Sequence, residues 1–309
     1  MSVIHRYRDS LDLIDQNLIM YLKSGDRYLN GSLDYLKTMR GKMLRPMLSL
    51  ISAKISEQPE NLSIATALEM LHIGTLIHDD VIDESKLRRS QESIQSKYSK
   101  EYAIYMGDYM FSSLFVYLAD TDINKETLVI LANVMQKICI AEMKQWHHRY
   151  NLEQSVREYL RIISGKTASL FSLSLASGSD DLDLRRRLQK IGYHLGMAFQ
   201  IQDDLLDFEG DQVMVGKELY KDLTIGNYNL PILYAIEQRP EIMRRLLLEQ
   251  ADLTEDIRHQ VVETSAYQAT RDLLDQYFAK IDREIQLLPD NAGRSDLIDL
   301  VEILRTRAI

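Results

Sequence analysis

The chain has few of the residues that interrupt or cross-link a fold. Its 309 residues include 5 prolines, 13 glycines and a single cysteine. One cysteine excludes a framework of internal disulfides, and we expect Cys139 to be a buried thiol because it lies in the apolar run VMQKICIAEM. Few glycines and prolines, and no stretch rich in them, favour helices and leave no evident linker. We therefore predict an all-α protein with a single domain over residues 1–309.

Excess positive charge and long apolar runs are also missing. The formal net charge is −9, whereas nucleic acids and anionic membranes are bound through basic surfaces. No run approaches the ~20 apolar residues that cross a bilayer, and the N-terminal MSVIHRYRDSLDLIDQ has no apolar signal core. We expect a soluble cytoplasmic protein that binds no nucleic acid and makes at most transient contact with a membrane.

What the chain does contain is a repeated cluster of aspartates at the end of an apolar run. The members are Asp79, Asp80 and Asp83 in HDDVID, and Asp203, Asp204 and Asp207 in QIQDDLLD. On a helix, residues three and four apart share a face, so each cluster concentrates negative charge. A lone cluster of this kind is ordinarily a solvated helix end. Two copies are better explained by helices that face one cavity, where carboxylates hold Mg²⁺ shared with a phosphate.

Five short motifs together resemble those of the trans-isoprenyl diphosphate synthases, the polyprenyl synthetase family. In order, they are GKMLRP at 41–46, DDVID with Arg88 and Arg89, GKTA at 165–168, FQIQDDLLD at 199–207, and Gly216, Lys217, Asp222, Leu223, Gly226, Leu230 and Pro231. The resemblance runs over roughly 41–235. YAIYMGDYMFSSLF and YNLEQSVREYLRI are most similar to the catalytic subunit of two-component heptaprenyl and hexaprenyl diphosphate synthases. The resemblance implies an isoprenoid synthase helical bundle around a central cavity.

The resemblance also implies the reaction. Such an enzyme is a prenyltransferase that joins isopentenyl diphosphate head to tail to an allylic diphosphate such as farnesyl diphosphate. Several Mg²⁺ ions, held by the six aspartates, would neutralise the allylic diphosphate and make it a leaving group. The double bond of isopentenyl diphosphate then attacks the allylic cation, and a proton is lost to the departed diphosphate. We expect no protein general base and a dry cavity, because water would quench the cation.

Individual roles follow from the same resemblance. The residues that it implies for isopentenyl diphosphate are Lys42, Arg45, His72 and Arg89. Those for the allylic diphosphate and the reacting carbon are Arg88, Lys166, Thr167, Gln200 and Lys217. We expect Lys42 and Arg45 to share one face of a helix over 29–56 that Pro46 bends, and a kink at Gly165 that directs Lys166 and Thr167. At the position of Asn227, members of the family often carry another lysine, so we expect this loop to be less basic here.

Small residues before the first aspartate cluster indicate a long product. Thr75 and Gly74 lie four and five residues before Asp79, where short-chain members of the family carry aromatic residues. A helix advances ~5.4 Å per turn, about the length of one isoprene unit. We predict that the growing tail passes both residues and stops near Leu71, Leu68 or Met110. The expected product is heptaprenyl or hexaprenyl diphosphate, and geranylgeranyl or farnesyl diphosphate is the alternative.

Two other classes of protein have to be weighed. A terpene cyclase also carries DDxxD on helices, but its second metal motif has a different pattern, and QIQDDLLD argues against it. A non-catalytic partner subunit loses the aspartates or the arginines, which are complete here. The resemblance leaves two assemblies open, a homodimer and a heterodimer with a small non-catalytic subunit.

Overall fold

The structure is a computed structural model that describes residues 3–39, 41–209, 223, 225–249 and 254–306. Within these ranges the regular elements are helices, apart from a short hairpin in which β1 (Leu87–Arg88) pairs antiparallel with β2 (Gln91–Glu92). This confirms the all-α prediction. No helix in the described ranges is long and apolar enough to cross a membrane.

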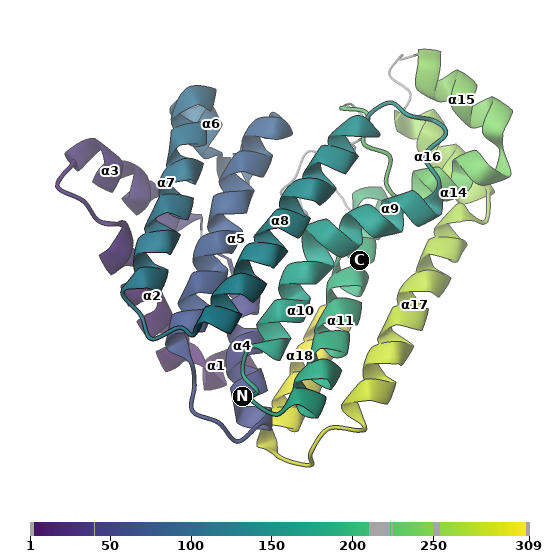
Figure 1. The fold of residues 1–309 in the computed structure, drawn as a ribbon. Coiled ribbons are helices and arrows are strands. Elements are labelled where there is room, and N and C mark those ends of the chain that lie inside the picture. Colours follow the sequence, from purple (N-terminus) through teal and green to yellow (C-terminus); the bar gives the residue numbers. More distant parts are fainter. Residues whose placement is uncertain (1–2, 40, 210–222, 224, 250–253, 307–309) are drawn as a thin grey trace.

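The first half of the chain builds one side of the bundle (Figure 1). Its helices are α1 (Val3–Arg6), α2 (Arg8–Leu22), α3 (Arg27–Thr38), α4 (Leu44–Ile55), α5 (Leu62–Ile82), α6 (Ile94–Lys97), α7 (Lys100–Ala119) and α8 (Lys125–His147). The side chain of Asn61 caps α5 by accepting the Ile64 N–H at 3.0 Å. Helix α5 is buried along most of its length and packs against α2, α4 and α7, as its nearly continuous apolar sequence requires.

The second half builds the other side. Its elements are α9 (Val156–Ile163), the π-helical turn η1 (Ser164–Ala168), α10 (Ser169–Ala176), α11 (Leu182–Glu209), α14 (Leu230–Gln238), α15 (Pro240–Glu249), α16 (Thr254–Glu263), α17 (Ala266–Ile285) and α18 (Ala292–Arg305). Helix α11 carries the second aspartate cluster and packs between α10 and α17. Helix α4 contacts both α5 and α10, so the two halves share one packed interior.

The predicted helix over 29–56 is wrong. The chain forms α3 and α4 with a loop between them, and Met43 in that loop has a φ of 49°. Lys42 therefore lies in the loop and does not share a helix face with Arg45. Pro46 is the third residue of α4, where a missing N–H breaks no intrahelical hydrogen bond, so it starts the helix instead of bending it.

The prediction of a buried cysteine is also wrong. Cys139 is exposed on α8, whose buried residues are Leu131, Val134, Ile138 and Ala141. These four positions define a stripe with helical spacing. Cys139 follows one of them and points away from the stripe. Its apolar neighbours Ile140 and Met143 are exposed as well.

Candidate active site

The first aspartate cluster lies where α5 ends and the hairpin folds back over it. Arg88 on β1 donates to both carboxylate oxygens of Asp80, with Nε at 2.9 and 2.7 Å and Nη2 at 2.6 Å. Asp80 is only 4% exposed. The middle aspartate of the motif is thus committed to an arginine in a two-pronged, charge-assisted contact.

The other two aspartates of this cluster are one helical turn apart. Burial raises the pKa of Asp79, although the Lys166 ammonium opposes that effect. Asp83 caps α5 and accepts from Arg149 Nη2 at 3.2 Å. A buried carboxylate with a raised pKa lacks sufficient positive charge nearby. Asp79 therefore lies where an added cation would be stabilised.

The second cluster is on α11, and its middle aspartate is again held by the protein. Asp204 accepts from the Tyr159 hydroxyl at 2.5 Å, and more weakly from Gln200 Nε2 and the Leu230 N–H, both at 3.3 Å. Burial nevertheless raises the pKa of Asp204 to about 8. Tyr159 had no sequence signal, because its role depends on α9 lying against α11.

The π-helical turn confirms the predicted irregularity at Gly165. It sets Lys166 Nζ at 3.0 Å from both Glu142 and Gln145 of α8. Thr167 Oγ1 donates to Gln200 Oε1 at 2.9 Å. Burial lowers the pKa of Lys166, but the surrounding carboxylates outweigh that effect and raise it. The lysine is therefore a permanently charged group inside the site.

A cavity of about 610 Å³ joins the two aspartate clusters. Its lining residues are Asp83, Gln145, His148, Gln154, Tyr159, Ile162, Ile163, Lys166, Gln200, Asp204, Asn227, Tyr228 and Asn229. We call it the amide cavity, because five of these residues are asparagine or glutamine. Asp83 comes from the first cluster and Asp204 from the second, which agrees with the expectation that the two motifs face one cavity.

A second cavity, of about 470 Å³, lies beside α5. Its lining residues are Leu36, Met39, Gly41, Glu69, His72, Ile73, Leu76, Ile77, Asp80, Arg88, Arg89 and Ile94. We call it the cation cavity. Arg89 has a φ of 51° and donates from Nη1 to the Met39 carbonyl at 2.5 Å. Of the residues expected at isopentenyl diphosphate, His72 and Arg89 line this cavity, and Lys42 is not among the described lining residues. Arg88, which was expected at the allylic diphosphate, lines the same cavity.

His72 and Arg45 are in direct contact beside the cation cavity. Arg45 Nη1 donates to His72 Nε2 at 2.8 Å. Burial, helped by the positive charge of Arg45, Arg88 and Arg89, lowers the pKa of His72 well below its usual value. Burial also lowers the pKa of Arg45 to about 10. His72 is thus neutral and accepts a hydrogen bond, while Arg45 keeps its charge at neutral pH.

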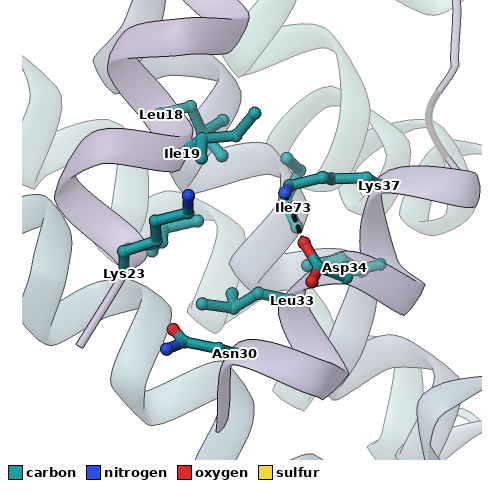
Figure 2. Close-up of a pocket in the computed structure, with 10 residues that line it drawn as sticks. Leu18, Ile19, Lys23, Asn30, Leu33, Asp34, Lys37 and Ile73 are labelled. Atoms are coloured by element: carbon teal, nitrogen blue, oxygen red, sulfur yellow. Dashed lines mark hydrogen bonds and ion pairs between the residues drawn. The ribbon is translucent and has the colours of Figure 1, made fainter. Parts of the chain in front are cut away.

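A further cavity, of about 360 Å³, lies between α2, α3 and α5. Figure 2 shows its leucine and isoleucine walls, with Lys37 paired to Asp34 at 2.5 Å near the edge. It shares Leu36 and Ile73 with the cation cavity. None of the predicted substrate or metal residues lines it, so we assign it no part in the reaction.

The residues predicted to set product length lie between α5 and α7. Leu71 and Met110 are fully buried, and Thr75 Oγ1 donates to the His72 carbonyl at 2.8 Å. Gly74 is covered by Phe111, because a Cβ on Gly74 would lie 2.6 Å from the ring. Sequence reasoning missed Phe111, whose position depends on how α7 packs against α5.

One predicted residue cannot be placed, and two residues near the site were not predicted. Lys217, expected to bind the allylic diphosphate, falls in 210–222, outside the described residues. Glu142 and Arg149 were not predicted, since each lies on α8 or just after it without a motif. Burial raises the pKa of Glu142 to about 7, and its ion pair with Lys166 opposes that effect.

The residues present fit a hard divalent cation. Carboxylate oxygens are the ligands that Mg²⁺ and Ca²⁺ prefer, and Asp79 is buried without sufficient compensating charge. Among the described residues, no group of three or more His, Cys, Asp or Glu side chains is arranged to hold an ion by itself. An ion here would share its ligands between the protein and a substrate oxygen.

Comparison with known proteins defines the class of enzyme. A sequence profile of the polyprenyl synthetase family matches residues 26–265, and the chain belongs to this family. It is 33% identical to heptaprenyl diphosphate synthase component 2 of Bacillus subtilis, over 97% of this chain and 88% of that protein. The chain is therefore a trans-prenyl diphosphate synthase, a prenyltransferase of a family that uses divalent metal ions.

Two solved structures share the whole fold. Heptaprenyl diphosphate synthase from Staphylococcus aureus is 28% identical, with a TM-score of 0.89 over 98% of each chain. A polyprenyl synthase from Caulobacter crescentus, complexed with calcium and isoprenyl diphosphate, is 27% identical, with a TM-score of 0.91 over 99% of this chain and 97% of that one. Other similar structures, at 30% and 28% identity, are named for geranylgeranyl and decaprenyl products. Membership of the family therefore does not determine product length.

Proposed function

We propose that this prenyltransferase elongates an allylic diphosphate such as farnesyl diphosphate with isopentenyl diphosphate and releases heptaprenyl or hexaprenyl diphosphate. The observation that carries the proposal is the pair of cavities that adjoin the first aspartate cluster, one reaching Asp83 and the other Asp80. The amide cavity combines Lys166 with carboxylates of both aspartate clusters, and the cation cavity holds His72, Arg88 and Arg89. A reaction between two diphosphates requires two such anion sites.

In this proposal the aspartates divide into two kinds. Asp79, Asp83, Asp203 and Asp207 hold Mg²⁺, several ions per site, together with diphosphate oxygens. Asp80 and Asp204 orient the motifs: Asp80 accepts from Nε and Nη2 of Arg88, whose Nη1 is left for a diphosphate oxygen, and Asp204 accepts from Tyr159. When bound, Mg²⁺ supplies the positive charge that stabilises the departing diphosphate.

The chain's own groups bind and orient the two substrates. Arg45, His72 and Arg89, with Lys42 from the neighbouring loop, hold isopentenyl diphosphate. Arg88, Lys166 and Lys217 hold the allylic diphosphate.

Thr167 and Gln200, already hydrogen-bonded to each other, face the reacting carbon, and the proton leaves with the diphosphate. Apolar side chains such as Ile162 and Ile163 in the amide cavity help to exclude water.

Product length follows from the small residues beside the first cluster. The tail passes Gly74 and Thr75 and ends against the buried Leu71 and Met110. This part of the proposal is supported by the relative from Bacillus subtilis, which is named heptaprenyl diphosphate synthase component 2. It is the part on which similar enzymes differ most.

The test is a product assay with purified protein, Mg²⁺, farnesyl diphosphate and labelled isopentenyl diphosphate, with products separated by chain length. We expect elongation that depends on Mg²⁺ and ends at six or seven isoprene units. A product of fifteen or twenty carbons would contradict the length assignment and favour the farnesyl or geranylgeranyl alternative. Absence of turnover by folded protein, restored by cell extract, would indicate that a small partner subunit is required.

A further inference from the structure

Gln95 on α6 joins the end of α5 to the segment that leads into the hairpin. Its Nε2 donates to the Asp80 carbonyl at 2.5 Å and to the Ser85 carbonyl at 2.9 Å. Both partners are oxygens that only accept, so the amide nitrogen with its two protons faces them. The side chain is partly buried. One side chain thus connects two turns of backbone at the point where the first aspartate cluster ends.

Helix α5 ends within that cluster in a left-handed turn. Glu84 has a φ of 51°, the Ser85 N–H donates to the Asp80 carbonyl at 2.8 Å, and the Glu84 N–H donates to the Val81 carbonyl at 3.3 Å. These are the two hydrogen bonds of a Schellman motif, in which the left-handed position is usually glycine. A glutamate there makes the turn costly, so the turn depends on support from outside the helix.

The loop between α5 and α6 contains two further residues in the left-handed region. Arg89 has a φ of 51° and Ser90 a φ of 63°. Conformations of this kind raise the energy of the backbone and persist where surrounding contacts hold them. Ser93 Oγ, at the start of α6, donates to the Ser85 carbonyl at 2.5 Å. Ser93 therefore holds the loop, whereas Gln95 holds both the loop and α5.

The position of the Asp80 carbonyl matters because Asp79 and Asp83 lie on either side of it. The Asp83 N–H donates to the Asp79 carbonyl at 2.8 Å, so the last turn of α5 sets the two carboxylates one turn apart on one face. The side chain of Asp80 is held by Arg88. If this turn frays, as helix ends do, Asp83 moves away from Asp79, and an ion shared between them loses a ligand.

We propose that Gln95 is a positioning residue for metal binding, because it holds the last turn of α5 in the geometry in which Asp79 and Asp83 share a divalent cation. This inference rests on the proposed function, which assigns the cation to these aspartates, and adds a residue that touches neither substrate nor metal. The isopentenyl diphosphate side has its own anchor, since Arg89 Nη1 donates to the Met39 carbonyl. Gln95 therefore acts on the metal and not on that substrate.

The test is binding of Mn²⁺ in the presence of farnesyl S-thiolodiphosphate, an analogue that resists ionisation, with free Mn²⁺ measured by electron paramagnetic resonance. The variant is Gln95→Met, which keeps the length of the side chain and removes its donor. Each carbonyl keeps one partner, the Ser85 N–H or Ser93 Oγ, so the variant should fold. We expect its dissociation constant for Mn²⁺ to rise about fivefold, the effect of losing one neutral hydrogen bond. Its affinity for isopentenyl diphosphate alone, measured by calorimetry, should stay the same.

The matched control is Ser93→Ala, which removes the cap of α6 and the second contact to the Ser85 carbonyl but leaves both donors to the Asp80 carbonyl. It should lower the melting temperature and leave Mn²⁺ binding unchanged. An unchanged dissociation constant for Mn²⁺ in Gln95→Met, an equal rise in Ser93→Ala, or loss of the fold in Gln95→Met would overturn the inference and leave the proposed function intact. Wild-type protein that binds no Mn²⁺ in the presence of the analogue would refute the proposed function, and the inference with it.

Discussion

At the scale of single residues, the charged groups around the two cavities are paired with one another before any ligand binds. Arg88 holds Asp80, and Lys166 holds Glu142. Such pairs keep buried charges from standing uncompensated. A diphosphate that enters therefore meets side chains that are already held in place. His72 differs because burial keeps its imidazole neutral.

The first residue-scale prediction concerns His72 and acid stability. Its pKa is lowered in the folded protein, so the folded chain leaves it neutral while the unfolded chain takes up a proton below about pH 6.5. Stability contributed by this residue is thus complete above pH 6.5 and is lost as the pH falls below it. The loss at pH 5.5 should be about 1.4 kcal/mol.

Denaturant unfolding of the ligand-free protein at pH 7.5 and 5.5 measures this loss. His72→Gln keeps an acceptor for Arg45 and removes the titration, so its drop in stability between the two pH values should be smaller by that amount. His259→Gln, which alters an exposed histidine on α16, serves as the control and should behave as the wild type does. An equal drop in all three proteins would show that His72 does not carry the effect.

At the scale of elements, α5 and α7 interlock through small residues. Gly74 on α5 lies under Phe111, and a Cβ on Gly107 of α7 would lie 2.2 Å from His78. The two rings stack, with centroids 5.5 Å apart and planes within 6°. Each helix thus places an aromatic ring over a glycine of the other. Helix α7 therefore takes part in setting the space beside the first aspartate cluster.

This interlock leads to a prediction about product length. Phe111→Ala removes the ring above Gly74 and leaves both helices their backbone contacts, so the tail gains room and the product distribution should shift by one or more isoprene units to longer chains. Thr75→Phe and Gly74→Phe fill the same region and should shorten the product. Chain-length analysis of the reaction products measures all three.

A suitable control is Phe115→Ala, one turn further along α7, where the side chain is 60% exposed and should not affect length. A product ladder from active Phe111→Ala and Thr75→Phe that matches the wild type would refute the assignment of this region to the tail. Activity of each variant is checked first, since Gly74→Phe must displace the Phe111 ring to fold.

The helices and turns around the site show which structural features could be predicted from the sequence. The helix that carries the first aspartate cluster was expected, because a long apolar run precedes the aspartates. The irregular turn at Gly165 was also expected. The break between α3 and α4 was not predicted, because the sequence of residues 39–43 is compatible with a helix. In the structure Arg89 donates to the Met39 carbonyl at this break, a contact that the local sequence does not reveal. Contacts between residues far apart in sequence, such as Tyr159 with Asp204, leave no local pattern.

At the scale of the whole molecule, large apolar side chains are exposed on two successive helices. On α7 and α8 they are Ile104, Tyr105, Phe115, Val116, Val129, Ile140, Met143 and Trp146. Isolated apolar residues on a surface need no explanation, but a concentration of them marks a site of association. These exposed side chains of α7 and α8 are candidates for the contact in either expected assembly. The sequence resemblance leaves a homodimer and a heterodimer with a small non-catalytic subunit open, and one similar protein is named component 2 of heptaprenyl diphosphate synthase.

A direct measurement distinguishes a homodimer of this chain from a heterodimer with a small subunit. If two copies of this chain meet there, the purified protein should sediment as a dimer, and Phe115→Glu with Met143→Glu should convert it to a monomer, because two buried charges would oppose association. Leu287→Glu, at a site equally exposed and away from these helices, should leave the dimer intact. Trp146 is the only tryptophan of the chain, so its fluorescence should shift to longer wavelength in the monomeric variant as water reaches the indole. A wild-type protein that sediments as a monomer at micromolar concentration, with the emission of an exposed indole, would contradict the homodimer and assign this surface to a different partner.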